Sequence, residues 1–291
     1  MAPLLEKIIR RFCFYTWRFW ERLGVHVIPN HFYFPVLDSR KLASYDFNKV
    51  FACEGIDFED EQMLKLIPAY ASYYKEYEPL HKEVGYSSNG DGAILYGMIR
   101  HLKPKRVVEV GSGYSTQLVC EAAKKNSGEG SCSHEAQVTC IEPYPKPVLK
   151  ELEKNKKVIL IEDKVEETDP AVFEELESGD VLFIDSSHVV DTGNDVHFLY
   201  LELLPKIPVG VYVHIHDIRL PYEYPKSWVL NAHKHWGEQY LLHMFLSFNN
   251  SFEVVFASNY MFERYKRDMV DALYGLDEDG WPGSFWIRRT R

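Results

Sequence analysis

The sequence predicts an α/β protein in which a mostly parallel sheet carries helices on both of its faces. Two observations predict this fold class. From residue 106 onward, short apolar runs alternate with segments of helical periodicity, which is the pattern of a doubly wound sheet. In addition, three of the predicted strands finish on an acidic residue, at the edge where open parallel sheets bind their ligands.

The chain of 291 residues is long enough for one large α/β domain and a modest extension. We expect residues 1–85 to form an N-terminal extension of helix and aromatic loop, and residues 86–291 to form the domain. Hydrophobic residues make up 46% of the sequence, which provides for a sizeable core. Acidic residues outnumber basic ones by 43 to 33, so the formal net charge is −10. This balance argues against a nucleic-acid partner, which needs a basic face.

The cysteines and the apolar runs indicate the compartment. An odd number of cysteines without any C-x-x-C pair favours neither a disulfide framework nor a zinc cluster, and suits a reducing environment. The cysteines are Cys13, Cys53, Cys120, Cys132 and Cys140. No apolar run in the sequence reaches the ~18 residues of a membrane span. We therefore expect a cytoplasmic protein with no transmembrane segment.

Residues 1–23 place apolar side chains at helical spacing with basic residues between them, which predicts a helix. Arginines interrupt the apolar positions, so the segment is a poor secretory signal. The helix either packs on the domain or on a second subunit of a homo-oligomer, which we favour, or lies on a membrane surface. The loop that follows is dense in aromatic side chains, which either seal a hydrophobic edge or close over a pocket. These side chains are His31, Phe32, Tyr33 and Phe34.

The other elements are predicted from hydrophobic periodicity and from glycine and proline breaks. Helices are expected within residues 57–80 and at 91–102, 145–154, 166–177 and 193–204. Strands are expected at 106–110, 138–142, 158–161, 180–185, 209–217, 252–257 and 284–289. Residues 219–250 form an insertion whose second half is helical. Its aromatic side chains either wall a substrate pocket or anchor the insertion, and they are Tyr222, Tyr224, Trp228 and Trp236.

The stretch RVVEVGSGYST, which ends at Thr116, is predicted to be a buried strand, a glycine-rich turn and the start of a helix. Gly111 and Gly113 let the backbone turn tightly and approach a ligand closely. Ser115 and Thr116 are favourable N-cap residues for the helix. Glu109 stands just before the glycines, where a carboxylate would repel a pyrophosphate but attract an ammonium group. An ordinary tight turn is the alternative.

Four motifs follow one another along the chain: E-V-G-S-G-Y-S-T from Glu109, C-I-E-P around Glu142, L-F-I-D-S-S-H up to His188, and V-H-I-H-D-I. Their order and spacing resemble those of class I S-adenosylmethionine-dependent methyltransferases, over about residues 90–291. The resemblance implies a Rossmann-like, doubly wound, seven-stranded sheet, S-adenosylmethionine as cofactor and a small-molecule methyl acceptor. The likeness to dinucleotide-binding dehydrogenases is weaker, because Thr116 stands where their G-x-G-x-x-G fingerprint has its third glycine.

The resemblance assigns the acidic strand ends to the cofactor. Glu109 and the glycine turn would hold its methionine part, Glu142 would accept both ribose hydroxyls, and residues 163–165 would border the adenine. The residues implied in cofactor binding are Glu109, Gly111, Ser112, Gly113, Tyr114, Ser115, Thr116, Glu142, Val165 and Asp185.

Two further segments, D-S-S-H at 185–188 and H-I-H-D at 214–217, close the fourth and fifth predicted strands. In catechol-type O-methyltransferases, aspartates at these strand ends bind a divalent metal ion. A lysine that acts as the base stands three residues after the first of these aspartates, and in this chain His188 has that position. The resemblance therefore implies Asp185 and His188 as catalytic residues. A histidine is a plausible base in place of the lysine, because its unperturbed pKa near 6.5 suits proton removal at neutral pH.

A metal site at these strand ends is incomplete by the catechol-type pattern, because Ile218 stands where that pattern has an asparagine. Asp185 and Asp217 would bind the metal. His214 or His216, which share one face of the strand, would supply the missing ligand and favour a softer ion than Mg²⁺. Alternatively, these histidines are core residues whose hydrogen bonds are satisfied within the protein.

The first hypothesis for function is an O-methyltransferase in which His188 deprotonates a substrate hydroxyl, with or without a divalent metal ion. Asp185 and His188 can both face the cleft only if the chain turns at Ser186-Ser187, whose hydroxyls can bond local backbone. An N-methyltransferase and a non-catalytic S-adenosylmethionine-binding protein are the alternatives.

Overall fold

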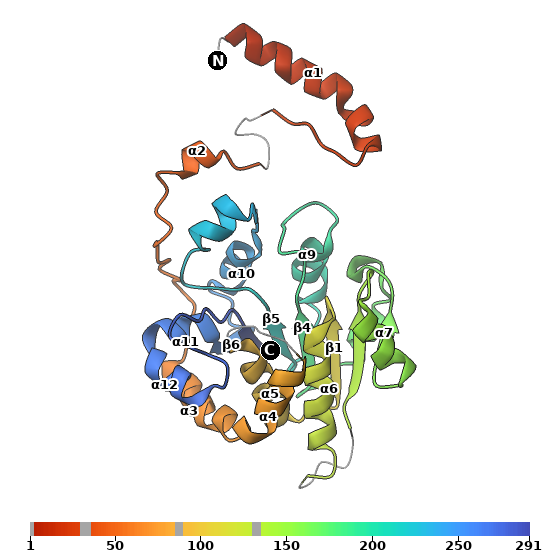
Figure 1. Ribbon diagram of the computed structural model, residues 1–291, viewed down its shortest axis with the longest axis vertical. Helices are drawn as coiled ribbons and strands as arrows, with labels where there is room; N and C mark the ends of the chain where they lie inside the picture. The colour runs from red at the N-terminus through yellow and green to blue at the C-terminus, as the bar shows by residue number, and fades with distance from the viewer. Residues whose placement is uncertain (1–2, 30–35, 85–89, 130–134) are drawn as a thin grey trace. The chain divides into compact units, whose positions relative to one another are not determined.

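The computed structural model describes residues 3–29, 36–84, 90–129 and 135–291 (Figure 1). The predicted aromatic loop from His31 to Phe34 and Cys132 lie outside the described residues. The chain forms two compact units, which are considered one at a time. The smaller contains Met1–Phe47 and Pro225–His235, and the larger contains Asn48–Tyr224 and Trp236–Arg291.

The smaller unit contains helix α1 (Pro3–Arg22), the helical turn α2 (Ser39–Leu42) and the short π-helix η3 (Ser227–Asn231). The predicted N-terminal helix is therefore confirmed. Apolar side chains at three- and four-residue spacing along and just after α1 are about half exposed or more: Leu5, Ile8, Phe12, Phe19 and Leu23. Among the described helices, none has the length and apolar character needed to cross a membrane.

Removal of residues 1–23 is expected to change the oligomeric state or to lower the melting temperature. An apolar stripe of this size is usually covered by protein, either of the same chain or of a second copy. Size-exclusion chromatography with light scattering measures the first effect and thermal unfolding the second. Loss of liposome association at unchanged mass and melting temperature would instead assign the helix to a membrane surface.

The larger unit is built on a seven-stranded sheet with the strand order β3-β2-β1-β4-β5-β7-β6. The strands are β1 (Arg106–Val110), β2 (Gln137–Ile141), β3 (Ile159–Ile161), β4 (Val181–Ile184), β5 (Tyr212–Ile215), β6 (Phe252–Ala257) and β7 (Phe285–Arg289). The first five are parallel, and β7 runs antiparallel to both of its neighbours. The predicted mostly parallel, seven-stranded sheet is confirmed, and each strand lies inside its predicted range except that β2 begins one residue earlier.

The helices of this unit are α3 (Asp60–Ala71), α4 (Tyr74–Val84), α5 (Asp91–Leu102), α6 (Tyr114–Asn126), α7 (Pro147–Lys154), α8 (Ala171–Glu174), α9 (Asp195–Phe198), α10 (Glu238–Leu246), α11 (Ser258–Arg264) and α12 (Lys266–Ala272). A π-helix, η2 (Leu199–Leu203), continues α9. The chain passes from β1 to β2 through α6 and from β4 to β5 through α9, in opposite directions along the sheet (Figure 1). Because such crossovers are right-handed, α6 and α9 cover opposite faces.

One predicted helix is wrong in extent. Residues 166–177 were expected to form a continuous helix, but they contain only the end of a 3₁₀ turn, η1 (Val165–Glu167), and the single turn α8. Pro170 explains the break, because proline has no backbone N–H and disfavours helical backbone in the residue before it. Val165 begins η1, four residues after the end of β3, and lines the cleft at the carboxyl edge of the sheet.

The strand order reverses between β1 and β4, since the chain moves outward to β2 and β3 on one side and to β5 on the other. A crevice forms at such a switch point beyond the carboxyl ends of the strands. The predicted acidic strand ends therefore lie at one edge of the sheet, on both sides of this crevice.

Candidate functional site

The glycine turn after β1 is shaped by contact with the end of β4. Gly111 has a φ of +79°, and a Cβ atom there would lie 1.9 Å from the carbonyl oxygen of Asp185. Any other residue would push the two strand ends apart, which explains the glycine at this position. The Gly111 N–H donates to the carbonyl of Ile141 at 3.1 Å, so the turn is also joined to β2.

The second glycine begins the helix. Gly113 is the N-cap of α6, and its N–H donates to Oγ1 of Thr116 at 3.0 Å. The expectation that Ser115 or Thr116 is the N-cap is therefore wrong. The N-cap is Gly113, and the Thr116 side chain, inside the first turn, accepts the N–H of that N-cap residue. A Cβ atom at Gly113 would meet nothing within 4 Å, so the space beside this residue is open.

Glu109 lies in the middle of β1 and is fully buried. Its Oε1 accepts a hydrogen bond from the Ser115 hydroxyl at 2.5 Å, whereas Oε2 has no partner among the described residues. Burial raises the pKa of this carboxyl to about 7, although the hydroxyls of Ser115 and Thr116 oppose the shift. A buried carboxylate oxygen without a donor is costly, so the position fits a ligand that brings a donor, ideally a positive one.

A cleft of about 550 Å³ opens at the carboxyl ends of β1, β2 and β4. Of the predicted cofactor residues it gathers four: Gly111, Glu142, Val165 and Asp185. Glu142 is half-buried, and its Oε1 accepts from the Tyr144 N–H at 2.8 Å. Sequence reasoning did not single out Tyr144, whose exposed ring also lines the cleft; its position two residues after the strand-end acid was the available signal.

The other predicted cofactor residues mostly support the turn. Ser112 donates to the Glu109 carbonyl at 3.0 Å, and Ser115 and Thr116 are bonded as described above. Tyr114 is about half exposed, with the Lys146 ammonium 5.3 Å from the centre of its ring. Whether these side chains touch a cofactor stays a prediction.

The turn after β4 forms as the sequence indicated. The Ser186 hydroxyl accepts from the His188 N–H at 3.1 Å, and the Ser187 hydroxyl accepts from the Val189 N–H at 3.4 Å. His188 itself has a φ of +61°, in the left-handed region. This backbone folds His188 back over the strand end, so that its Nε2 lies 3.4 Å from Oδ1 of Asp185.

The same imidazole also faces the end of β5. Nε2 of His188 lies 3.8 Å from Oδ2 of Asp217, a residue whose φ of +56° is likewise left-handed. Left-handed backbone at two non-glycine residues costs energy, and such strain concentrates at functional sites. The structure thus joins the two predicted segments, D-S-S-H and H-I-H-D, around one histidine ring.

Sequence reasoning missed the partner on the other side of this ring. Glu238, the first residue of α10, is fully buried, and its Oε2 lies 2.7 Å from Nδ1 of His188. The same oxygen accepts from the Ser186 hydroxyl at 2.9 Å. Trp236 packs on the imidazole with ring centres 4.3 Å apart. The only sequence signal was an acid beside a tryptophan in the predicted insertion.

The charge on His188 follows from these neighbours. Burial lowers the pKa of its imidazole, but the hydrogen bonds and charges of Asp185 and Glu238 outweigh burial and raise the pKa to about 10. Burial would raise the pKa of Asp185, but the charges of His216 and His188 hold it below its usual value. In the cofactor-free protein this site is therefore an imidazolium held between carboxylates.

His214 in β5 and His216, one residue after its end, lie on one face, as predicted, with Nε2 of His214 3.3 Å from Nδ1 of His216. His214 stacks on Phe183 in the core at 4.2 Å, and burial lowers its pKa well below the usual value. His216 is nearer the site, with Nε2 3.9 Å from Oδ1 of Asp217. Burial would lower the pKa of His216, but the charge of Asp185 and other carboxylates raises it.

These residues do not fit the predicted metal. Among the described residues, no three His, Cys, Asp or Glu side chains are arranged to hold a metal ion. At the strand ends, Nε2 of His188 lies 3.4 Å from Oδ1 of Asp185 and 3.8 Å from Oδ2 of Asp217, so the imidazole already faces both carboxylates. The metal-ligand roles predicted for Asp185, Asp217 and His216 gain no support.

The four aromatic residues singled out in the predicted insertion have different neighbours. Trp236 lies against His188, and Tyr224, which is fully buried, meets Trp236 edge to face at 5.9 Å. Tyr222 forms an isolated bridge with Val50. Trp228 belongs to the smaller unit. Trp236 therefore packs directly on His188.

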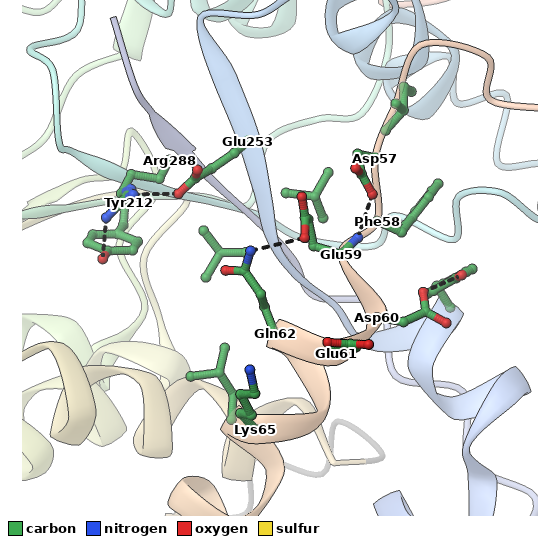
Figure 2. A pocket seen from close by; sticks show the side chains of 15 residues that line it. Asp57, Phe58, Glu59, Asp60, Glu61, Gln62, Lys65, Tyr212, Glu253 and Arg288 are labelled. Carbon is green, nitrogen blue, oxygen red and sulfur yellow. Dashed lines mark hydrogen bonds and ion pairs between the residues drawn. The ribbon is translucent and has the colours of Figure 1, made fainter.

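A second cavity, of about 960 Å³, lies against α3 and β6 (Figure 2). Tyr212 and Arg288, which line it, stand at the start of β5 and near the end of β7, so the cavity is at the amino edge of the sheet. Its charged groups bind one another: Arg288 lies 2.6 Å from Glu253, and Gln62 donates to Glu59 at 3.0 Å. The cavity is larger than the cleft but distant from the acidic strand ends, and no chemistry is assigned to it.

Comparison with known proteins finds similarity to methyltransferases. Residues 108–218 match the family model Methyltransf_24, which describes a methyltransferase domain. The matched segment runs from β1 past Asp217, so it includes the glycine turn, Glu142 and both aspartates. An uncharacterized protein of Archaeoglobus fulgidus is 29% identical over 167 residues, which cover 51% of this chain and 73% of that protein.

Solved structures show remote likenesses. The plantazolicin methyltransferase BpumL, in complex with SAH, has 12% identity and a TM-score of 0.38, covering 80% of this chain and 98% of that one. A methyltransferase from Geobacter sulfurreducens has 16% identity and a TM-score of 0.37, and the match covers 89% of this chain and 100% of that one. A protein from Thermobifida fusca named as a putative methyltransferase has 12% identity and a TM-score of 0.33, and the match covers 84% of this chain and 97% of that one. These likenesses are too remote to place any site residue.

The family match places a methyltransferase domain at residues 108–218, and the strand order agrees with the predicted Rossmann-like fold. The predicted enzyme class is confirmed. The narrower resemblance to catechol-type O-methyltransferases stays a prediction.

Proposed function

We propose that this methyltransferase acts on a hydroxyl group of a small molecule, with His188 as the general base. The observation that supports this most strongly is the placement of His188. Its Nδ1 is bonded to buried Glu238, and its Nε2 faces the strand ends that border the cleft. A histidine that is oriented by a carboxylate on one nitrogen and free to exchange a proton on the other is suited to proton removal.

The described residues fit S-adenosylmethionine at the switch point. Oε2 of Glu109 lacks a donor and would accept from the cofactor ammonium, while Glu142 would accept from the ribose hydroxyls. Val165 and Tyr144 line the part of the cleft where the adenine would lie. When bound, the cofactor supplies a methyl group on a positively charged sulfur, and the protein has to hold the acceptor oxygen in line with that methyl group.

The two nitrogen atoms of the His188 imidazole have separate roles in this proposal. Glu238 accepts the Nδ1 proton and so leaves Nε2 as the atom that takes the proton of the acceptor hydroxyl. With a pKa of about 10, His188 is mostly cationic at neutral pH in the cofactor-free protein. A positive charge that arrives next to Asp185 offsets that carboxylate and lowers the pKa of His188, which makes the neutral base more accessible in the complex.

No metal ion is part of this proposal. Asp185 and Asp217 instead stabilise the imidazolium that forms when His188 accepts a proton, because both carboxylates face Nε2. Trp236 covers the ring and helps to exclude water from the proton transfer.

Calorimetric titration with S-adenosylmethionine and S-adenosylhomocysteine tests the cofactor assignment, and a screen of hydroxylated and amine-bearing compounds for release of S-adenosylhomocysteine tests the reaction. We expect binding of both ligands and turnover of hydroxyl acceptors. Absence of binding at millimolar ligand would overturn the proposal. Turnover of amines alone would make the protein an N-methyltransferase, and binding without any turnover would leave a non-catalytic cofactor-binding protein.

Cofactor affinity should depend on pH through Glu109. The free carboxyl has a pKa of about 7, and contact with an ammonium lowers that pKa, so binding below pH 7 releases a proton. Affinity should therefore rise with pH, from about tenfold below its maximum near pH 6 to a plateau above about pH 7, and should fall again once the amine itself deprotonates near pH 8. Calorimetry in buffers of different ionisation enthalpy measures the proton release.

The control for this prediction is Glu109→Gln, which keeps the shape of the side chain but cannot ionise. This variant should bind the cofactor more weakly than the wild type above about pH 7, approach the wild type at acid pH, and lack the rise toward pH 7. A wild-type affinity that stays constant across this range would show that Glu109 does not contact the ammonium.

A further inference from the structure

Helix α1 presents one apolar side to solvent. Its apolar side chains recur at spacings of three and four residues, so they share one side of the helix, and each is about half exposed or more. Single exposed apolar residues are ordinary on a protein surface, but a continuous stripe usually marks a binding face. This apolar stripe consists of Leu5, Ile8, Phe12, Tyr15, Phe19 and Leu23.

Basic side chains border the apolar stripe along one edge. Arg11, Arg18 and Arg22 are exposed and follow one another at spacings of seven and four residues, which places them in one row beside the stripe. By the same spacing, the acidic Glu21 lies on the opposite side of the helix. A partner for this face should therefore be apolar in its middle and acidic at its side.

The cavity of about 960 Å³ against α3 and β6 has a lining of this kind. Part of the lining is apolar: Ile56, Phe58, Leu66, Val254 and Val255. Five acidic side chains stand around it (Figure 2): Asp57, Glu59, Asp60, Glu61 and Glu253. Four of the five belong to residues 57–61, which lead into α3 and begin it, so the negative charge is concentrated on one side.

The basic residues of this lining offset only part of that charge. Arg288 is paired with Glu253 at 2.6 Å, and Asp60 lies 3.2 Å from Arg264, which is outside the lining. Lys65 is then the remaining basic residue of the lining, and three acidic residues remain with it. The acidic side of the cavity is therefore suited to a cationic partner.

We infer that α1 of one copy of this chain docks in the cavity against α3 and β6 of a second copy. The apolar stripe would cover the apolar lining, and the arginines beside the stripe would face residues 57–61. In a two-fold dimer the contact occurs twice, so two helices and two cavities contribute to one interface. The residues that line the cofactor cleft are separate from those that line this cavity, so the inference does not depend on the proposed function.

Charge favours this occupant over a second α1 helix. Helix α1 contains five basic and two acidic residues, so two such helices side by side would repel each other. The whole chain has a formal net charge of −10, so the part outside α1 is strongly acidic. A second copy therefore offers α1 an attractive field as well as an apolar surface.

Charge reversal on each face tests the contact in the full-length protein. The helix variant is Arg11→Glu/Arg18→Glu, and the cavity variant is Glu61→Lys/Gln62→Lys. Analytical ultracentrifugation should find a dimeric wild type. The dissociation constant of each variant alone should be about 10- to 100-fold higher, because like charges then meet at both contacts of the dimer.

An equimolar mixture of the two variants should dimerise again. The acidic helix of the first variant then meets the basic cavity of the second, and the unchanged helix of the second meets the unchanged cavity of the first. Such recovery requires two different chains and the two named faces. It therefore distinguishes this dimer from a helix packed on its own chain and from pairing of two α1 helices.

Matched controls come from exposed positions on other helices. Arg267→Glu on α12 and Glu151→Lys on α7 reverse charges of the same signs and should dimerise as the wild type does. Both double variants should melt close to the wild type, because glutamate and lysine are good helix formers. A test without any variant is salt: the wild-type dimer should weaken between about 50 and 500 mM salt, since salt screens exposed charge pairs.

Four results would reject the inference: a monomeric wild type, variants that dimerise like the wild type, a mixture of folded variants without recovery, or a dimer insensitive to salt. A monomeric wild type whose helix variant melts at a lower temperature would place α1 on its own chain. A monomeric wild type that binds vesicles of anionic phospholipid would place α1 on a membrane surface.

Discussion

Replacing His188 with alanine should reduce the turnover number by about 10²–10⁴-fold, the usual contribution of a general base. The affinity for S-adenosylhomocysteine should change little, because His188 is not among the residues that line the cleft. Steady-state release of S-adenosylhomocysteine, with an acceptor found by screening, measures the first effect and calorimetry the second.

The pH profile adds a readout that a structural histidine would not change. Because the pKa of His188 is raised to about 10, the imidazole of the free enzyme is cationic at lower pH and becomes a base only as the pH rises. With cofactor saturating, the value of kcat/KM for the acceptor should therefore increase with pH up to a pKa below about 10, because the cofactor charge lowers the pKa of His188, and the residual activity of His188→Ala should lack this dependence. His101→Ala, at an exposed position near the end of α5, is the control and should behave as the wild type.

Chelation completes the test of the site. EDTA should leave turnover unchanged, in line with a site in which His188 lies between Asp185 and Asp217. If His188→Ala kept near-full activity while EDTA abolished it, the base assignment would fail and a metal-dependent mechanism would replace it. If neither treatment had an effect, the cluster would be structural, and the enzyme would work by holding its substrates together.

The second large effect is expected for Glu142→Ala. The carboxylate would accept two ribose hydroxyls, and each hydrogen bond to a charged acceptor contributes about 1.5–3 kcal/mol. Losing both should weaken cofactor binding by about 10²–10⁴-fold. The structure supports this expectation, since Glu142 lines the cleft and its Oε1 is oriented by the Tyr144 N–H. Calorimetry with S-adenosylhomocysteine is the direct measurement.

A loss of this size in Glu142→Ala is meaningful only for a folded protein. The thermal midpoint should stay close to that of the wild type, because the side chain is half-buried at a cleft and bonds only the adjacent turn. Glu151→Ala, at an exposed position of α7, controls for the loss of one negative charge. Equal affinities for the wild type and Glu142→Ala would place the ribose elsewhere.

Much of the fold was predictable because its signals are local. The β-branched residues at 107, 108 and 110 predict a buried strand from local pattern alone, and β1 forms there, although Glu109, which was expected to close the strand, is followed by Val110 within it. The turn after β4 was predictable for the same reason, since Ser186 and Ser187 bond the backbone only two residues away. Where the local signal was mixed, as around Pro170, the predicted helix proved too long.

The candidate site was predictable as far as strand ends determine it. In a parallel sheet the carboxyl ends share one edge, so the sequence positions of Glu142, Asp185 and Asp217 were enough to bring them to one side of the molecule. The position of His188, three residues past a strand end, indicated that it faces the same edge.

Three features of the site depended on the tertiary structure alone. Glu238 bonds His188 across fifty positions of sequence, and no periodicity links an acid in the insertion to a histidine after β4. The charge state of His188 depends on that contact and on its burial, both of which are properties of the packed state. The poor fit for a metal depends on which atom fills the space between Asp185 and Asp217.

The sequence by itself therefore determined the architecture, the enzyme class and the edge of the sheet at which the candidate site lies, because these follow from short-range pattern and from the geometry of parallel strands. Only the tertiary structure decided which groups meet at that edge. Hydrogen-bond partners, burial and unpaired atoms such as Nε of Arg219 result from contacts between segments far apart in the chain, and the physical properties of a buried ionisable group are set by those contacts.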